Sequence, residues 1–233
     1  MVNIMKVAIL ISGFLRTFDF NKDKLYDLFK KYDTDYFLHI TVDNNNDNYI
    51  NIFNNLDKIV KLLKPKQILH EKNINFIDKD NFNMKNMWYK FYILNNIKNI
   101  YQKNSNIKYD IVIRIRPDVF ILNNNIELLK DTQYIYGIND EFFYGSNDKI
   151  NEIANIYDNI DYICKNKKIK KNEIFFKYLK IKNLKLINHN IKYKLILSLC
   201  NMFAISGDSG SGKTTLMNYL QNIFVDNIVK IEG

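Results

Sequence analysis

Two arginines and an aspartate at the end of a predicted strand form the clearest chemical cluster in the sequence. Isoleucine occupies every second position early in the segment 109–120, a two-residue period that is typical of a β-strand. That period places Arg114, Arg116 and Asp118 on one side, with Asp118 just beyond the Pro117 that ends the strand. Guanidinium groups match phosphate oxygens, and a neighbouring carboxylate can hold a divalent cation that bridges those phosphates. The simpler interpretation is a structural Arg–Asp ion pair at the strand end.

A second candidate site follows the first predicted strand. The apolar run 6–11 has the continuous pattern of a strand that is buried on both faces of a parallel sheet, and it leads directly into Ser12 and Gly13. A small residue and a glycine at the carboxyl end of a strand let a ligand approach the backbone closely. Arg16 follows three residues later and is placed to reach an anionic group. We therefore expect a loop that can bind an anionic ligand here.

Further candidates lie in the second half of the chain. Asp140 and Glu141 precede an aromatic run and a glycine, so either could act as a general base or bind an acceptor hydroxyl. The alternative is that they are solvated acids beside ordinary aromatic packing. Glu173 lies in the first turn of a predicted helix, where a capping role is the favoured interpretation. His189 could complete a metal site with Asp118, although a lone histidine is weak support.

The sharpest motif lies near the C-terminal end of the given sequence. Residues 207–214 fit the phosphate-binding pattern G-x-x-x-x-G-K-[ST], with Gly207 and Gly212 at its glycine positions, and an apolar segment precedes the motif. In such a loop Lys213 would reach the β- and γ-phosphates of ATP and Thr214 would hold Mg²⁺. The sequence of this motif resembles that of uridine-kinase and phosphoribulokinase-like P-loop kinases. Because only residues 199–233 remain for such a domain, we expect a fragment of a fused kinase or a remnant of one.

Composition limits the classes of protein that fit. The 233 residues have a formal charge of +9, but the lysines are scattered, and the densest run, 165–171, is typical of a solvated loop. This pattern favours anionic small ligands over nucleic acid. The two cysteines show neither disulfide nor zinc spacing, and no apolar run has the length of a membrane span. We expect a soluble cytoplasmic protein, located in the host cytoplasm if the source is viral.

The hydrophobic periodicity alternates between strand and helix, which is typical of an α/β nucleotide-binding sheet. Predicted strands cover 6–11, 36–42, 67–70, 109–120, 134–138 and 184–189, with a strand or bend at 140–146. Predicted helices cover 23–31, 50–63, 83–101, 126–130, 149–163 and 172–180. In this scheme His39 is a packed strand residue.

The order of these motifs resembles that of a group of bacterial and giant-virus glycosyltransferases with a GT-A-like fold. The resemblance covers roughly residues 6–196 and rests on five features in order: Leu10 to Gly13 with Arg16, the strand end 36–39, the segment 109–118, the segment 140–146 and the Glu173 helix. It implies a Rossmann-like, mainly parallel sheet flanked by helices over residues 1–198. The incomplete P-loop unit, 199–233, would follow as a second domain.

The resemblance also implies an activity. A nucleotide-sugar donor would bind at Ser12, Gly13 and Arg16, and the sugar would pass to a glycan or another hydroxyl acceptor facing Asp140. Asp118 would stand where such enzymes place the acid that binds a divalent metal, Mn²⁺ or Mg²⁺. This chain has no Asp-x-Asp motif, because Val119 and Phe120 follow Asp118.

Three functional hypotheses therefore stay open. In the leading one, a sugar transferase uses a metal at Asp118, or instead neutralises the leaving diphosphate with Arg114 and Arg116. In the second, the chain is an ATP-binding P-loop kinase with an accessory first domain. In the third, it is a degenerate transferase fold kept as a binding module, with Asp118 and the arginines tied up in internal pairs.

Overall fold

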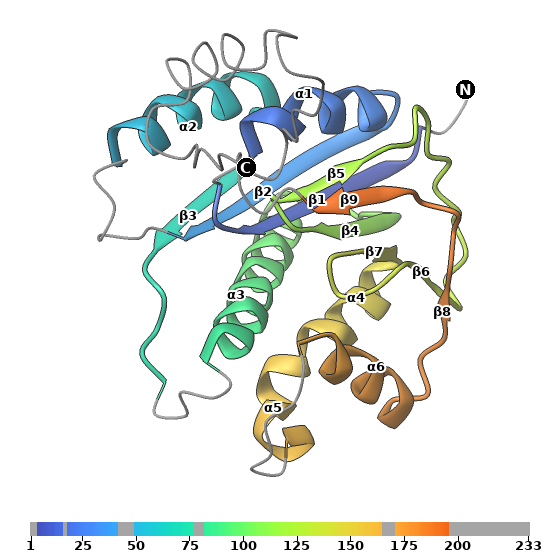
Figure 1. Cartoon of the computed structure of the whole chain (residues 1–233). Coiled ribbons are helices and arrows are strands. Elements are labelled where there is room, and N and C mark those ends of the chain that lie inside the picture. The colour runs from blue at the N-terminus through green and yellow to red at the C-terminus, as the bar shows by residue number, and fades with distance from the viewer. Residues whose placement is uncertain (1–3, 16–17, 42–48, 77–81, 165–170, 196–233) are drawn as a thin grey trace, which may run out of the picture.

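A mixed, mainly parallel sheet forms the centre of the computed structural model, which describes residues 4–15, 18–41, 49–76, 82–164 and 171–195. Its seven strands follow the order β3-β2-β1-β4-β7-β6-β8. Neighbours pair in parallel from β3 to β4 and between β6 and β8, while β7 is antiparallel to both β4 and β6. The predicted α/β class with a mainly parallel sheet is confirmed (Figure 1).

The elements have the following bounds. The strands are β1 (Lys6–Gly13), β2 (Asp33–Thr41), β3 (Gln67–Glu71), β4 (Ile111–Ile115), β5 (Val119–Ile121), β6 (Ile135–Gly137), β7 (Phe142–Gly145), β8 (Leu186–Ile187) and β9 (Tyr193–Leu195). The helices are α1 (Phe18–Phe29), α2 (Tyr49–Leu63), α3 (Phe82–Asn104), α4 (Asn147–Ala154), α5 (Ile156–Cys164) and α6 (Lys171–Ile181).

Helices cover both faces of the sheet, as the continuous apolar pattern of β1 requires. Side chains of β1 alternate between the two cores: Ile9 and Ile11 pack with α1 and α2, whereas Ala8 and Leu10 pack with α3 and the later helices. In Figure 1, α1 and α2 lie on one side of the sheet, and α3 to α6 lie on the other. The carboxyl ends of β1 and β4 are thus held in a rigid three-layer frame.

Most predicted elements are present, with shifted ends, but three predictions need correction. The helix predicted at 126–130 is absent: Ile126 and Leu128 are both buried, and this two-residue spacing fits an extended segment. The helix predicted at 149–163 is two helices, since α4 ends at a C-cap on Asn155. The single strand predicted at 109–120 is divided into β4 and β5 by the turn at Pro117.

One strand was not predicted at all. β9 pairs antiparallel with β5, so that Tyr193 lies opposite Ile121 and Leu195 lies opposite Val119. This two-stranded sheet brings a segment from near residue 195 beside the turn that follows β4. Within the described ranges, none of the helices is both long and apolar enough to cross a bilayer.

A buried lysine lies between α3 and α4. Lys98 is fully buried, and its ammonium group donates to the side-chain oxygens of Asn147 and, at 3.4 Å, Asn151. Burial lowers its pKa from 10.5 to about 7, while the charge of Asp148 opposes that shift. Asn147 follows Gly145, which pairs with Val112 near the start of β4, so Lys98 lies away from the carboxyl end of that strand.

Candidate functional site at the ends of β1 and β4

The candidate site lies where the strand order reverses. From β1 the chain proceeds outward to β2 and β3, and α3 then carries it back across the sheet to β4 on the other side of β1. In open α/β sheets, ligands bind beyond the carboxyl ends of the strands at such a switch point. Here those ends carry Ser12 and Gly13 on β1 and the segment 116–118 after β4.

Gly13 is in close contact with the turn that follows β4. Its φ of +135° is rarely adopted by residues with a side chain, and a Cβ atom there would lie 3.3 Å from Cδ of Pro117. On the other side, the side-chain amide of Asn21 in α1 donates to the carbonyl of Pro117 at 2.8 Å. The end of β1, helix α1 and the turn after β4 are therefore packed together. Ser12 is buried, and its hydroxyl has no hydrogen-bond partner among the described residues.

Arg116, Asp118 and Glu141 form an ion-pair network at this point. Nε of Arg116 donates to Oδ1 of Asp118 at 3.0 Å, and Nη2 donates to Oδ2, which makes a bidentate pair. Nη1 lies 3.4 Å from Oε1 of Glu141, and the backbone N–H of Arg116 donates to the Glu141 carbonyl at 3.0 Å. All three side chains keep between 13% and 23% of their surface exposed.

Two residues that the sequence did not indicate hold Glu141 in place. The hydroxyl of Tyr193 on β9 donates to Oε2 of Glu141 at 2.6 Å, and the side-chain amide of Asn139 donates to the same oxygen at 3.1 Å. That amide also lies 2.8 Å from the Tyr193 hydroxyl. Burial and the bond to Glu141 raise the pKa of Tyr193 to about 12, so it stays a donor at neutral pH.

Arg114 does not join this network. It is fully buried on the α3 side of the sheet, with its guanidinium carbon 5.9 Å from the ring centres of both Phe91 and Phe143. None of its three side-chain nitrogens has a hydrogen-bond partner in the described part of the chain. Burial lowers its pKa to about 10, and Asp140 partly opposes this. Arg114 thus remains a cation that lacks a hydrogen-bonded partner here.

Asp140 is also buried, with 3% of its surface exposed. Burial raises the pKa of its carboxyl group, whereas the nearby Arg114 lowers it and Glu141 raises it further. Of the two acids singled out for acceptor binding, Glu141 is tied into the network of Arg116, and Asp140 lies deeper beside Arg114. Their roles toward an acceptor stay predictions.

The residues present do not fit a divalent-metal site at Asp118. Both of its oxygens accept hydrogen bonds from Arg116, and both oxygens of Glu141 have partners as well. Across the described residues, no three acidic, histidine or cysteine side chains lie together as metal ligands. His189 lies beside Tyr144, with its Nδ1 2.6 Å from the Tyr144 hydroxyl, and its suggested role in a metal site with Asp118 stays a prediction.

A second polar cluster lies behind Ser12, beneath α3. His39, which pairs in register with Ser12, has Nδ1 2.9 Å from the carbonyl of Lys90 and Nε2 2.9 Å from Glu71. The Lys90 ammonium group donates to the hydroxyl of Thr41 at 2.5 Å. Burial lowers the pKa of Lys90 to about 8. His39 is packed, as predicted, and this cluster supports the carboxyl end of β2.

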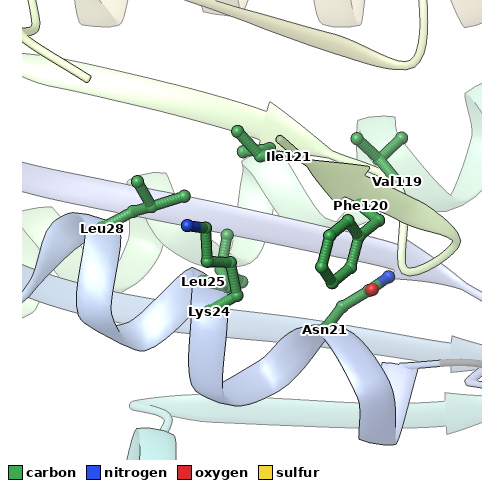
Figure 2. A pocket seen from close by; sticks show the side chains of 7 residues that line it. All are labelled: Asn21, Lys24, Leu25, Leu28, Val119, Phe120 and Ile121. Atoms are coloured by element: carbon green, nitrogen blue, oxygen red, sulfur yellow. The ribbon is translucent and has the colours of Figure 1, made fainter. Parts of the chain in front are cut away.

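A shallow hollow lies on the opposite face, between α1 and β5 (Figure 2). Its volume of about 170 Å³ includes open solvent, and apolar side chains line most of it, with Asn21 and Lys24 contributing polar atoms. Asn21 links the hollow to the candidate site through Pro117. It is too shallow to enclose a nucleotide.

Several predicted site residues lie outside the described residues. These are Arg16 in the loop after β1 and all of the P-loop residues: Gly207, Gly212, Lys213 and Thr214. Their roles, the Mg²⁺ proposed at Thr214 and the domain boundary at 198–199 stay predictions. Glu173 is exposed in the first turn of α6.

No protein-family model matches this sequence, and no curated protein does so. Among solved structures, the fold is similar to that of the CTP:phosphocholine cytidylyltransferase LicC from Streptococcus pneumoniae. The TM-score is 0.49 at 10% identity, covering 84% of this chain and 95% of that chain.

Two glycosyltransferases are also similar. One, involved in the glycosylation of the major capsid of PBCV-1, has a TM-score of 0.40 at 11% identity, covering 78% of this chain and 81% of that chain. The other, PaToxG glycosyltransferase, has a TM-score of 0.39 at 14% identity, covering 77% of this chain and 70% of that chain. All three TM-scores lie below 0.5, so the function of this chain has to be argued from its own residues.

Proposed function

We propose that this chain is a glycosyltransferase that moves a sugar from a nucleotide-sugar donor to a hydroxyl acceptor. The observation that carries the proposal is the contact of Gly13 with Pro117 at the point where the strand order reverses. Because Gly13 has no side chain, the turn at Pro117 can pack against the end of β1, at the edge of the sheet where ligands of such folds bind. Arg116 immediately precedes this turn and has a fork of N–H donors suited to phosphate oxygens.

The reaction breaks the bond between the anomeric carbon and the diphosphate oxygen of the donor. The acceptor oxygen forms a new bond to that carbon and loses its proton, and the nucleoside diphosphate leaves with the bonding electrons. Positive charge near the leaving diphosphate lowers the barrier, because negative charge develops there in the transition state. Arg116 and Arg114 supply that charge, and Asp140 takes the proton.

Thermal unfolding in the presence of UDP- and GDP-sugars tests donor binding. A donor present at about 100 times its Kd stabilises the folded state by about 2.7 kcal/mol, which raises the Tm of a chain of this size by roughly 5–10 °C. Arg116→Ala or Asp118→Ala should remove the shift. Lys30→Gln is a matched control, since it removes an exposed charge just after α1 whose one ion pair with a described residue is the pair with Asp27.

Three results would redirect the proposal. If none of the nucleotide sugars raises the Tm, the transferase function is wrong. If ATP with Mg²⁺ raises it instead and Lys213→Ala removes the effect, the P-loop kinase hypothesis is favoured. If a nucleotide sugar binds but no acceptor in a glycan panel is modified, the chain is better described as a binding module.

A further inference from the structure

The distribution of arginine in this chain is unusual. Only three of its 34 lysine and arginine residues are arginines, and two of them, Arg114 and Arg116, lie at the carboxyl end of β4. The third, Arg16, follows Gly13 by three residues in the sequence and lies outside the described residues. Where any positive charge suffices, this chain uses lysine. A guanidinium at the switch point therefore suggests a need for its planar fork of N–H donors.

Some N–H donors of the Arg116 guanidinium have no acceptor among the described residues. A guanidinium carries five N–H groups, and three of those on Arg116 are directed at the carboxylates of Asp118 and Glu141. Within the described residues, the remaining two have no protein acceptor. Because Asp118 accepts two parallel hydrogen bonds from the guanidinium, the Arg116 side chain is held in one orientation before any ligand binds.

Every oxygen of the two carboxylates, Asp118 and Glu141, already accepts a hydrogen bond within this network. Both oxygens of Asp118 face Arg116, while Glu141 uses one oxygen for Arg116 and the other for Tyr193 and Asn139. A metal ion at Asp118 would compete with the guanidinium for the carboxylate and would lie close to its positive charge. This arrangement fits carboxylates that position an arginine.

Two arginines supply positive charge at this point. Arg114 and Arg116 lie near three carboxyl groups, those of Asp118, Glu141 and the buried Asp140, and of these Asp140 has the largest effect on the pKa of Arg114. The buried Arg114 has no hydrogen-bonded counterion among the described residues, and its field in this low-dielectric region is weakly screened. The N-terminus of α1, a twelve-residue helix, follows the loop after Gly13 and adds partial positive charge.

We propose that Arg116, clamped by Asp118 and Glu141, binds the diphosphate of the donor in place of a divalent cation, so that donor binding needs no metal. This inference rests on the proposed function and specifies how its site neutralises charge. Asp118 and Glu141 are then positioning residues, and Tyr193 acts one step further out by holding Glu141.

The test is the affinity of the intact chain for UDP and for GDP, measured by calorimetry in excess EDTA and again with Mn²⁺ or Mg²⁺. We expect the Kd of the nucleotide that binds to agree within about threefold between the two conditions. Arg116→Lys should weaken binding at least tenfold in both, because lysine keeps the charge but has no fork. Lys30→Gln should leave the Kd unchanged.

Asp118→Asn separates the two possible roles of the carboxylate. A positioning residue predicts the same loss of affinity with EDTA as with metal, and the amide oxygen should preserve part of the binding. A metal ligand predicts a loss only when metal is present. Circular dichroism and the unfolding midpoint of each variant show whether it is folded.

The outcomes distinguish this inference from the function on which it rests. Binding that requires Mn²⁺ or Mg²⁺, or that Arg116→Lys leaves intact, overturns the metal-free site while the transferase remains. Absence of binding by UDP, GDP and every nucleotide sugar, in both conditions, overturns the transferase itself.

Discussion

The buried Lys98 should make the stability of the fold increase with pH. In the folded chain its pKa is about 7, compared with 10.5 for an exposed lysine. Between these values the unfolded chain binds one more proton than the folded chain, so the free energy of unfolding rises with pH. One group contributes at most about 1.4 kcal/mol per pH unit, and the rise from pH 7.5 to 9 due to Lys98 should be about 1 to 2 kcal/mol.

Lys98→Met keeps the length of the side chain and removes the ionisable group. Lys90 will still contribute a rise of the same sign, beginning near its own pKa of about 8, so the variant should show a shallower slope and not a flat one. Urea unfolding can be followed by the fluorescence of Trp88, which is the single tryptophan and is fully buried. Lys177→Met, on the exposed face of α6, is the matched control and should keep the wild-type slope.

The window from pH 7.5 to 9 excludes the titration of His39 and Tyr193. It lies above the range of His39, whose pKa burial lowers from 6.5. It also lies below the range of Tyr193, whose pKa is raised to about 12 by burial and by its bond to Glu141. If Lys98→Met has the same slope as the wild type, the ammonium group is not desolvated in the folded chain and the reasoning is refuted.

Three other substitutions test the site and its frame. Gly13→Ala should cost about 1–3 kcal/mol of unfolding free energy, since alanine disfavours φ of +135° and its Cβ would press on Pro117; an unchanged urea midpoint would show that this turn is not fixed. Tyr193→Phe should cost about 1–2 kcal/mol and weaken nucleotide binding by releasing Glu141, and equal affinity would contradict its positioning role. Phe175→Ala should lower the free energy of unfolding by about 3–5 kcal/mol, because its buried ring stacks on Phe143 in the aromatic core. A clearly smaller loss in urea unfolding would contradict this packing role.

Local patterns predicted the frame well. The apolar runs of β1 and β4 and the wide apolar face of α3 follow from burial on both sides of a sheet, and a sequence displays such burial directly. The two-residue spacing of Ile126 and Leu128 was misread as helical because short apolar segments fit either period.

The site was harder to predict, because it depends on contacts between distant segments. Strand parity placed Arg114 and Arg116 on one side, but the turn at Pro117 directs Arg116 toward Asp118 while Arg114 stays in the core. The bond from Tyr193 to Glu141 joins residues 52 positions apart, and no local pattern marks either residue as the other's partner. Only the register of β9 against β5 brings them together.

The central position of β1 also has a consequence for the synthesis of the chain. Its β2 edge can pair once about 40 residues exist, but its other edge waits for β4, which begins at Ile111. During that interval the ribosome presents a strand with one open edge and an apolar face that includes Ala8 and Leu10. Open apolar edges promote aggregation. Slower translation or chaperone capture before residue 115 should therefore influence the yield of folded chain more than later events do.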